Sequence, residues 1–393
     1  MSLVDAYIDL GLQIGRHIPG FVDAYYGPPD LRERTHGSPL ANPAELAASA
    51  AVLIEELDAD GFEPQRRRWL HAQLAGLHTV ARKLAGAEIQ YSDEVELCYG
   101  TRPARVPESA FAAAHAELEG LLPRNGTLSE RYRAWLEARV VPREQVKRVL
   151  DSIAADLRGR TARLVGLPQG EEAEVELVSD EPWTAFNYYL GGLRSRIAVN
   201  TDLPTHSTLV AQLVTHEIYP GHHTEHATKE QLLVRDQGCL EESVLLAGTP
   251  QSLVSEGIAG VGVEVLLEEE PEALGAEHLE RFAIELDAEE AGGIRRAREI
   301  LAAVPVNAAL LLYEDGATED EAREYLMTWG LVTKPRAQQQ LEFITDPVWR
   351  TYVSTYTQGV RLCRGFVKGD PKRFRRLLTE QLTPADLESA AGS

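Results

Sequence analysis

One segment, LVTHEIYPGHHTEH at residues 213–226, constrains the fold more strongly than any other part of the chain. It holds four of the eleven histidines and begins like a zinc-binding helix. In such a helix, a His-Glu pair is followed by a second histidine four residues after the first. Here that position is Pro220, and the next histidines are His222 and His223. A regular zinc-binding helix therefore cannot form in this segment.

Helical geometry predicts where the later histidines would lie relative to His216. On an ideal helix, His222 lies about 120° from the face of His216 and roughly 9 Å along the axis. His223 returns to that face but lies roughly 10.5 Å away. A zinc–nitrogen bond is only about 2.0–2.1 Å long, so neither could share a metal with His216 on a straight helix.

Pro220 predicts that the helix breaks. It has no N–H, and in a continuous helix its ring would clash with the carbonyl group of His216. It disfavours the α conformation at Tyr219, and Gly221 permits a positive φ. We therefore predict that one helix ends here and that Pro220 opens a second helical segment. The break would bring a later histidine back to the metal.

A third ligand is expected in residues 252–270, SLVSEGIAGVGVEVLLEEE. Glu256 lies in the first turn of a helical pattern, among apolar residues. A buried carboxylate is costly unless it is paired or binds a metal. The helix dipole would equally favour Glu256 as an exposed acid at the helix N-terminus. Glu264 is a weaker candidate in the same helix.

Most of the chain shows the three- and four-residue apolar spacing of helices, and β patterns are confined to residues 173–178 and 194–202. The pattern predicts a mainly α protein with a small β-sheet beside the metal-binding helix. Residues 121–130, LLPRNGTLSE, are a candidate linker. One compact unit is the alternative to a division there. The expected parts are a helical N-terminal part at 1–125, a helical metal-binding catalytic part at 126–383 and a frayed tail at 384–393.

The net charge argues against some classes of binding partner, and the cysteine content argues against some kinds of covalent and metal site. A net charge of -22 disfavours nucleic acid and anionic membranes. The three cysteines are odd in number and scattered, which indicates neither a disulfide framework nor a thiolate zinc site. No signal-peptide pattern and no membrane-spanning apolar run is present. We expect a cytoplasmic protein that acts on a small peptide or another small molecule, in an oligomeric state that the sequence does not predict.

HEIYPGHH (216–223) and SEGIA (255–259) together resemble the bacterial domain-of-unknown-function 885 family. Its members carry an HE-x-x-PGH segment and a later segment that begins with EG. PGFVDAYYGPP (19–29) and YTQGVRLCRGF (356–366) resemble weaker family segments. The family is thought to be related to gluzincin zinc metallopeptidases such as the carboxypeptidase Taq group. The resemblance implies a multi-helical, gluzincin-like metallopeptidase architecture.

The resemblance also implies roles for individual residues. His216, His222 and Glu256 match zinc ligands, and Glu217 matches the glutamate that activates water. His223 is expected beside the ligands, as an alternative ligand or as a group that contacts the substrate. The choice between the two neighbouring histidines stays open at this point.

Two further residues are expected to contact the substrate. Tyr356 would donate to the developing oxyanion, since the resemblance places a tyrosine–glycine segment there. Tyr352 and two nearby arginines are alternatives. Gluzincins pair the edge strand before the metal helix with the substrate backbone, which makes Asn200 a candidate substrate contact. A role for Asn200 as a turn residue is the alternative.

Two histidines and one glutamate leave the fourth position of a zinc ion open for water. Zinc lowers the pKa of such a water, and Glu217 could then accept its proton. The expected function is a zinc-dependent peptidase that cleaves short peptides. The alternatives are a metal-dependent hydrolase of a non-peptide amide or ester, and a non-catalytic metal-binding protein. Iron, cobalt and manganese also accept these ligands.

Overall fold

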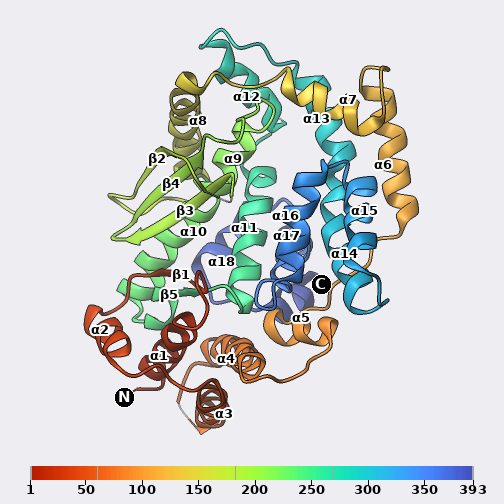
Figure 1. Cartoon of the computed structure of the whole chain (residues 1–393). Coiled ribbons are helices and arrows are strands. Elements are labelled where there is room, and N and C mark those ends of the chain that lie inside the picture. Colours follow the sequence, from red (N-terminus) through yellow and green to blue (C-terminus); the bar gives the residue numbers. More distant parts are fainter. Residues whose placement is uncertain (1, 60, 182, 269, 392–393) are drawn as a thin grey trace.

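The computed structural model describes residues 2–59, 61–181, 183–268 and 270–391. Helices dominate these residues, and the strands form one three-stranded and one two-stranded sheet (Figure 1). The predicted fold class, mainly α with a small sheet beside the segment of the histidines, is confirmed. None of the described helices is long and apolar enough to cross a membrane.

In sequence order, one set of helices precedes the three-stranded sheet and another set follows it. Those before it are α1 (Leu3–Gly15), α2 (Pro29–Gly37), α3 (Pro43–Ala59), α4 (Pro64–Leu84), α5 (Tyr91–Tyr99), α6 (Glu108–Leu121), α7 (Leu128–Glu137) and α8 (Arg143–Leu164). Those after it are α9 (Val210–Glu217), α10 (His222–Lys229), η1 (Glu230–Asp236), η2 (Leu240–Ser243), α11 (Pro250–Leu266), α12 (Pro271–Glu280), α13 (Ala288–Arg298), η3 (Glu299–Ala303), α14 (Val304–Tyr313), α15 (Glu319–Gly330), α16 (Lys334–Thr345), η4 (Tyr352–Ser354), α17 (Thr355–Val367), α18 (Pro371–Thr379) and α19 (Pro384–Ala391).

The three-stranded sheet has the order β2-β4-β3. β4 (Arg194–Asn200) lies in the centre, parallel to β2 (Glu172–Val178) and antiparallel to β3 (Ala185–Gly191). The expectation that residues 194–202 form an edge strand is therefore wrong, because β3 covers that side. The sheet lies beside α9 and α10 (Figure 1), and both helices contact β3.

The two-stranded sheet joins segments that are far apart in the sequence. β1 (Val22–Tyr25) pairs antiparallel with β5 (Val244–Leu246). β1 also contacts β3, so the small sheet lies next to the three-stranded one (Figure 1). This pairing places residues near the N-terminus beside the histidine helices.

α11 is the central helix of the site. Pro250 stands in its first turn, where the missing N–H is harmless. Most of its residues are buried, on every side of the helix, as expected for a helix enclosed by others. α17 crosses it at two glycines: a Cβ on Gly257 would lie 2.4 Å from the carbonyl oxygen of Gly359. These glycines therefore permit the close contact between α11 and α17.

Both the C-terminal residues and the candidate linker divide the chain into the predicted parts. Residues 384–391, expected to fray, form α19, which packs on α17 and buries Leu387. Residues 392–393 lie outside the described residues. Phe111 and Trp135, on opposite sides of the candidate linker, belong to one apolar core. The division of the chain at residue 125 stays a prediction.

Candidate metal centre

The segment of the histidines forms two short helices joined by a tight turn. α9 ends at Glu217 and α10 begins at His222, with a cis peptide bond between Tyr219 and Pro220. The predicted break is confirmed. Pro220 itself lies in the turn, however, and not at the first position of α10, whose N-cap is Gly221.

Gly221 is required because of a close backbone approach. Its φ is -77°, so it does not use the positive φ that glycine permits. A Cβ at this position would instead lie 1.8 Å from the carbonyl oxygen of His216 and 2.5 Å from that of Thr215. The turn folds directly back onto the last turn of α9, and only glycine leaves room for that approach.

The turn brings three of the sequence-predicted residues together. One ligand atom from each of His216, His222 and Glu256 lies within 4.8 Å of the other two. His216 Nε2 is 3.6 Å from Glu256 Oε2, and the rings of His216 and His222 are perpendicular with centroids 4.8 Å apart. Glu256 lies in the second turn of α11 and is 8% exposed, so the alternative of an exposed N-terminal acid is wrong.

The hydrogen bonds around these residues leave acceptors free for a cation. Ser255 donates to Glu225 Oε2 at 2.6 Å, so its oxygen is free to accept from His222 Nδ1 at 3.1 Å. With its proton on Nδ1, His222 keeps the lone pair on Nε2. Glu256 Oε1 accepts from Tyr352, but the buried Oε2 has no hydrogen-bond partner among the described residues. Two imidazole groups and one carboxylate oxygen without a hydrogen-bond partner are suitable ligands for zinc.

Burial determines the charge state of the centre. It lowers the pKa of His216 to about 3 and that of His222 to about 4, so both rings are neutral near pH 7. Burial, Glu256 and Asp23 raise the pKa of Glu217 to about 8. Burial, with Asp23 and Glu225 adding to it, raises the pKa of Glu256 to about 7. Neutral imidazoles bind metals, and acids that are hard to ionise gain from a nearby cation.

A second group of residues with ligand chemistry shares His222. Glu225 and His226 lie on α10 with it, and their ligand atoms also lie within 4.8 Å of one another. Glu225 is already engaged, because Lys229 donates to its Oε1 at 2.7 Å and Ser255 to its Oε2. This group therefore suits a metal less well than the group that contains Glu256.

His223 does not belong to the centre. It lies 100° further round α10 than His222 on an ideal helix. Its Nδ1 bonds Ser195 Oγ and its Nε2 bonds Glu171 Oε2, both at 2.8 Å. The side chain is 0% exposed. The expectation that His223 is an alternative ligand or contacts the substrate is therefore wrong: it fastens α10 to the sheet.

Asn200 is a turn residue at the end of β4. Its Nδ2 donates to the carbonyl oxygens of Glu181 and Trp183, and its Oδ1 accepts from the backbone N–H of Asp202. The residue is 2% exposed. Since the amide is used by the local backbone, the expectation that Asn200 contacts the substrate is wrong.

Two tyrosines extend from α17 and η4 toward the centre. Tyr352 donates to Glu256 Oε1 at 2.9 Å, which fixes that carboxylate. Tyr356 is 47% exposed, and its ring centroid lies 5.6 Å from that of Tyr352. Desolvation of the hydroxyl raises the pKa of Tyr356, and the charges of Glu256 and Glu217 add to this. The hydroxyl therefore stays protonated, as a hydrogen-bond donor must.

Asp23 on β1 is one residue that the sequence did not identify and whose charge acts on the centre. Its charge helps to raise the pKa values of Glu217, Glu256 and both tyrosines. Desolvation by the surrounding protein raises the pKa of Asp23 to about 7. The one available signal was its place in PGFVDAYYGPP, a segment that carried part of the family resemblance but no assigned chemistry.

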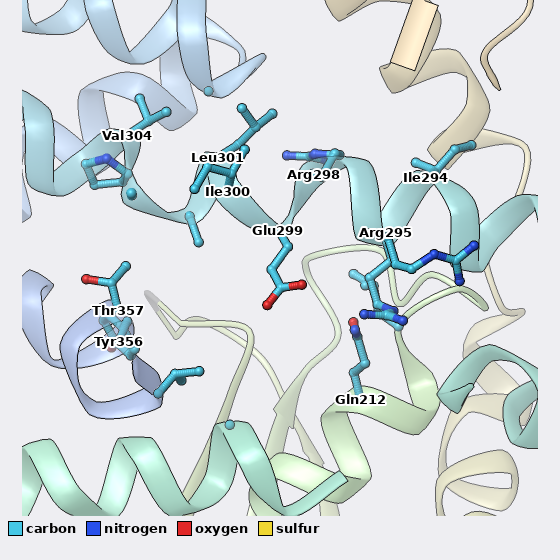
Figure 2. Close-up of a pocket in the computed structure, with 18 of the residues that line it drawn as sticks. Gln212, Ile294, Arg295, Arg298, Glu299, Ile300, Leu301, Val304, Tyr356 and Thr357 are labelled. Atoms are coloured by element: carbon cyan, nitrogen blue, oxygen red, sulfur yellow. The ribbon is translucent and has the colours of Figure 1, made fainter. Parts of the chain in front are cut away.

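A large cavity of about 1850 Å³ lies next to the centre. Gln212, one turn before His216, and Gly260, one turn after Glu256, line it, as does Tyr356. Figure 2 shows Gln212 and Glu299 directed into this space, with Tyr356 at its edge. The volume exceeds the 300–1,000 Å³ that is usual for small-molecule pockets, so the cavity has room for a short peptide.

Comparisons with known proteins support the fold alone. No family model and no curated protein matches the chain. A protein from Colwellia psychrerythraea, provisionally described as a lipoprotein, matches with a TM-score of 0.55 and 15% identity, over 88% of this chain and 66% of its own. The chain thus spans slightly less than two thirds of that protein. The likeness to the 885 family stays a prediction.

Two further solved structures are more distant. One is a provisionally described lipoprotein of unknown function from Shewanella oneidensis, with a TM-score of 0.48 and 11% identity over 92% of this chain and 75% of that one. The other is an M32 carboxypeptidase from Deinococcus radiodurans R1, with a TM-score of 0.39 and 14% identity over 100% of this chain and 94% of that one. Neither likeness is close enough to support an inference about function.

The raised carboxyl pKa values predict how the stability of the metal-free protein depends on pH. Glu217, at about 8, and Glu256 and Asp23, at about 7, keep protons that the unfolded chain has already lost. The free energy of unfolding should therefore fall as the pH rises from about 6.5 to 8. The lowered pKa values of His216 and His222 affect stability only below about pH 6.5, where they make the free energy of unfolding rise with pH.

Urea denaturation with a chelator present, at several pH values between 6.5 and 8, measures this dependence. The Glu217→Gln variant should show a smaller fall, because its neutral amide does not titrate. A free energy of unfolding that rises over this range in the chelated wild type would contradict the assignment of these groups.

Proposed function

We propose that this chain is a zinc-dependent hydrolase that cleaves short peptides, in the cytoplasm. The observation that carries the proposal is the meeting of His216, His222 and Glu256 at one point, with Glu217 directly after the first ligand. The resemblance of HEIYPGHH and SEGIA to the 885 family supports the same conclusion. A structural metal site would have no use for Glu217.

The donor set fits zinc, and the surrounding residues fit hydrolysis. Zinc held there would polarise a carbonyl group and lower the pKa of a water molecule. Glu217 would accept a proton from that water and deliver it to the leaving amine. Tyr356 would donate a hydrogen bond to the carbonyl oxygen as it becomes negative. Asn187 donates to the backbone carbonyl of Glu217 at 2.6 Å, which holds the end of α9 in place.

The adjoining cavity favours peptides over smaller substrates. Its wall carries charges of both signs, since Arg364 pairs with Glu264 and Glu299, and Arg295 with Glu272. Arg298 lies 3.7 Å from the ring centroid of Tyr132. A wall of this kind offers partners both to peptide groups and to charged side chains.

The neighbouring histidines provide a matched test. His222→Ala is expected to remove the metal and to abolish hydrolysis. His223→Ala is expected to keep one zinc ion per chain, but to lose about 1–3 kcal/mol of stability because Glu171 and Ser195 lose a partner. Elemental analysis and turnover of a short-peptide library, with and without a chelator, measure the two effects.

The same measurements define failure of the proposal. Wild-type protein that takes up no zinc from a zinc-containing buffer would contradict the metal centre. Zinc-loaded protein that hydrolyses acyl amides or esters but no peptide would contradict the substrate class. Retention of zinc by His222→Ala together with its loss from His223→Ala would reverse the assignment of the ligand.

A further inference from the structure

Arg298 lines the cavity beside the metal centre and has no carboxylate partner. It is the last residue of α13 and lines the same cavity as Tyr356 (Figure 2). Its Cζ lies over the ring of Tyr132 on α7, 3.7 Å from the ring centroid. Among the residues that the structure describes, no carboxylate or carbonyl oxygen accepts a hydrogen bond from Arg298. The cavity wall thus holds a cation that the chain itself does not neutralise.

The other arginines that line this cavity are either paired or exposed. Four of them form ion pairs with glutamates of the chain: Arg295 and Arg296 with Glu270, Arg361 with Glu388, and Arg364 with Glu264. Arg336 is exposed to water and donates to the side chain of Gln339. Within the described part of the chain, Arg298 is therefore the cavity arginine that is partly buried and lacks an anion.

The surroundings of Arg298 make the missing anion costly. Its Nε is buried and has no hydrogen-bond partner in the described residues, whereas its two Nη atoms are not enclosed in this way. Desolvation lowers the pKa of the guanidinium below its usual range, yet an arginine side chain keeps its charge in proteins. A cation that is partly removed from water without a counter-ion is unfavourable. This suggests that a ligand in the cavity supplies the negative charge.

The aromatic residues behind Arg298 hold its guanidinium in place. Tyr132 stacks on Trp135, with ring centroids 6.0 Å apart and an angle of 22° between the planes. Trp135 is 5% exposed, and its Nε1 donates to Glu290 Oε2 at 2.9 Å. A guanidinium that lies flat on an aromatic ring keeps the N–H groups along its edge available. Such a fixed planar fork matches the two oxygens of a carboxylate.

We propose that Arg298 binds a carboxylate group of the substrate, so that the cavity selects peptides that carry a free carboxylate. This inference rests on the proposed peptidase function. A single unpaired arginine suits one carboxylate better than a phosphate, which is usually bound by a cluster of arginines. The C-terminal carboxylate of a peptide and an acidic side chain offer the same group, and the experiment separates the two sources.

The test compares tri-, tetra- and pentaalanine with their C-terminal amides as substrates of the zinc-loaded protein. The amides lack the carboxylate, and a second set of amides with glutamate as the last residue carries it on a side chain instead. At one or more of these lengths, the wild type is expected to prefer a carboxylate peptide over the alanine amide by about 10- to 100-fold in kcat/KM, as for a charged hydrogen bond. Preference for the free alanine peptide identifies the C-terminal carboxylate as the ligand, and preference for the glutamyl amide identifies the side chain.

Variants of Arg298 assign this preference to one residue. In Arg298→Gln the ratio should fall toward one, mainly through a higher KM for the carboxylate peptide. Arg298→Lys keeps the charge without the planar fork, so it should retain only part of the preference, and it replaces Arg298→Gln if urea denaturation shows that variant to be unfolded. Arg133→Gln, the same change at an exposed position of α7 that does not line the cavity, should keep the wild-type ratio.

A binding measurement keeps the two proposals distinguishable. Calorimetric titration of the preferred carboxylate peptide into zinc-loaded Glu217→Gln should show binding that Arg298→Gln, added to that variant, weakens about 10- to 100-fold. Equal cleavage of the alanine amides and both kinds of carboxylate peptide by the wild type would overturn the role of Arg298 and leave the peptidase intact. A preference that Arg298→Gln keeps in full would do the same. Protein that neither cleaves nor binds any of these peptides would overturn both proposals.

Discussion

Glu217→Gln is expected to reduce kcat for peptide hydrolysis by at least about 100-fold and to leave one zinc ion bound per chain. A general base contributes about 10²–10⁴-fold, and an amide cannot accept the proton. The metal should stay because Glu217 lies outside the group formed by His216, His222 and Glu256. Steady-state kinetics and elemental analysis of the same preparation measure both effects.

A suitable control is Glu277→Gln, an exposed acid of α12 that does not line the cavity. Glu277 pairs with Arg281 at the surface, so its loss should change kcat less than about threefold, as for a surface ion pair. If Glu217→Gln retained the wild-type kcat, the role of Glu217 in proton transfer would be wrong. If it lost zinc, Glu217 would act as a ligand.

The sequence predicts the residues of the centre because their chemistry is local. Only a few local structures can accommodate a His-Glu pair, a proline that cannot continue the helix, or a glutamate in an apolar segment. The structure brings His216, His222 and Glu256 together as these patterns suggest. The choice between His222 and His223 could not be made, because it depends on how the chain re-enters a helix after the break.

The features that the sequence missed all depend on distant segments. β3, AFNYYLG, lacks the alternation of a half-buried strand, so β4 had no visible partner on that side. Asn200 was misassigned for this reason. Asp23 reaches the site through pairing with β5, which begins at Val244, and no local pattern predicts such a pairing.

The reason for Gly221 was also hidden from the sequence. Proline followed by glycine suggests a turn with a positive φ, since that is the commonest use of glycine in turns. The structure shows a close approach between two backbone segments instead. Conformational preference is a property of one residue, whereas this contact exists only after α9 and α10 have packed.

Gly221→Ala is expected to reduce zinc content well below one ion per chain and to destabilise the protein by about 1–3 kcal/mol or more. The new methyl group would have to displace the carbonyl group of His216, which lies in the backbone and cannot rotate away. Elemental analysis and urea denaturation measure the two losses. Gly120→Ala is the matched control, because Gly120 lies in α6 with nothing within 4 Å of a new Cβ.

In Gly120→Ala, zinc content should stay at the wild-type value and stability should stay equal or rise by about 0.5–1 kcal/mol, since alanine is the better helix former. The contrast separates a general effect of the methyl group from its effect at the turn. The displaced carbonyl belongs to His216 itself, so the shift acts directly on the first ligand and widens its separation from His222. A Gly221→Ala protein with full zinc content would mean that the turn can open without moving His216, and its geometry would then not determine the metal centre.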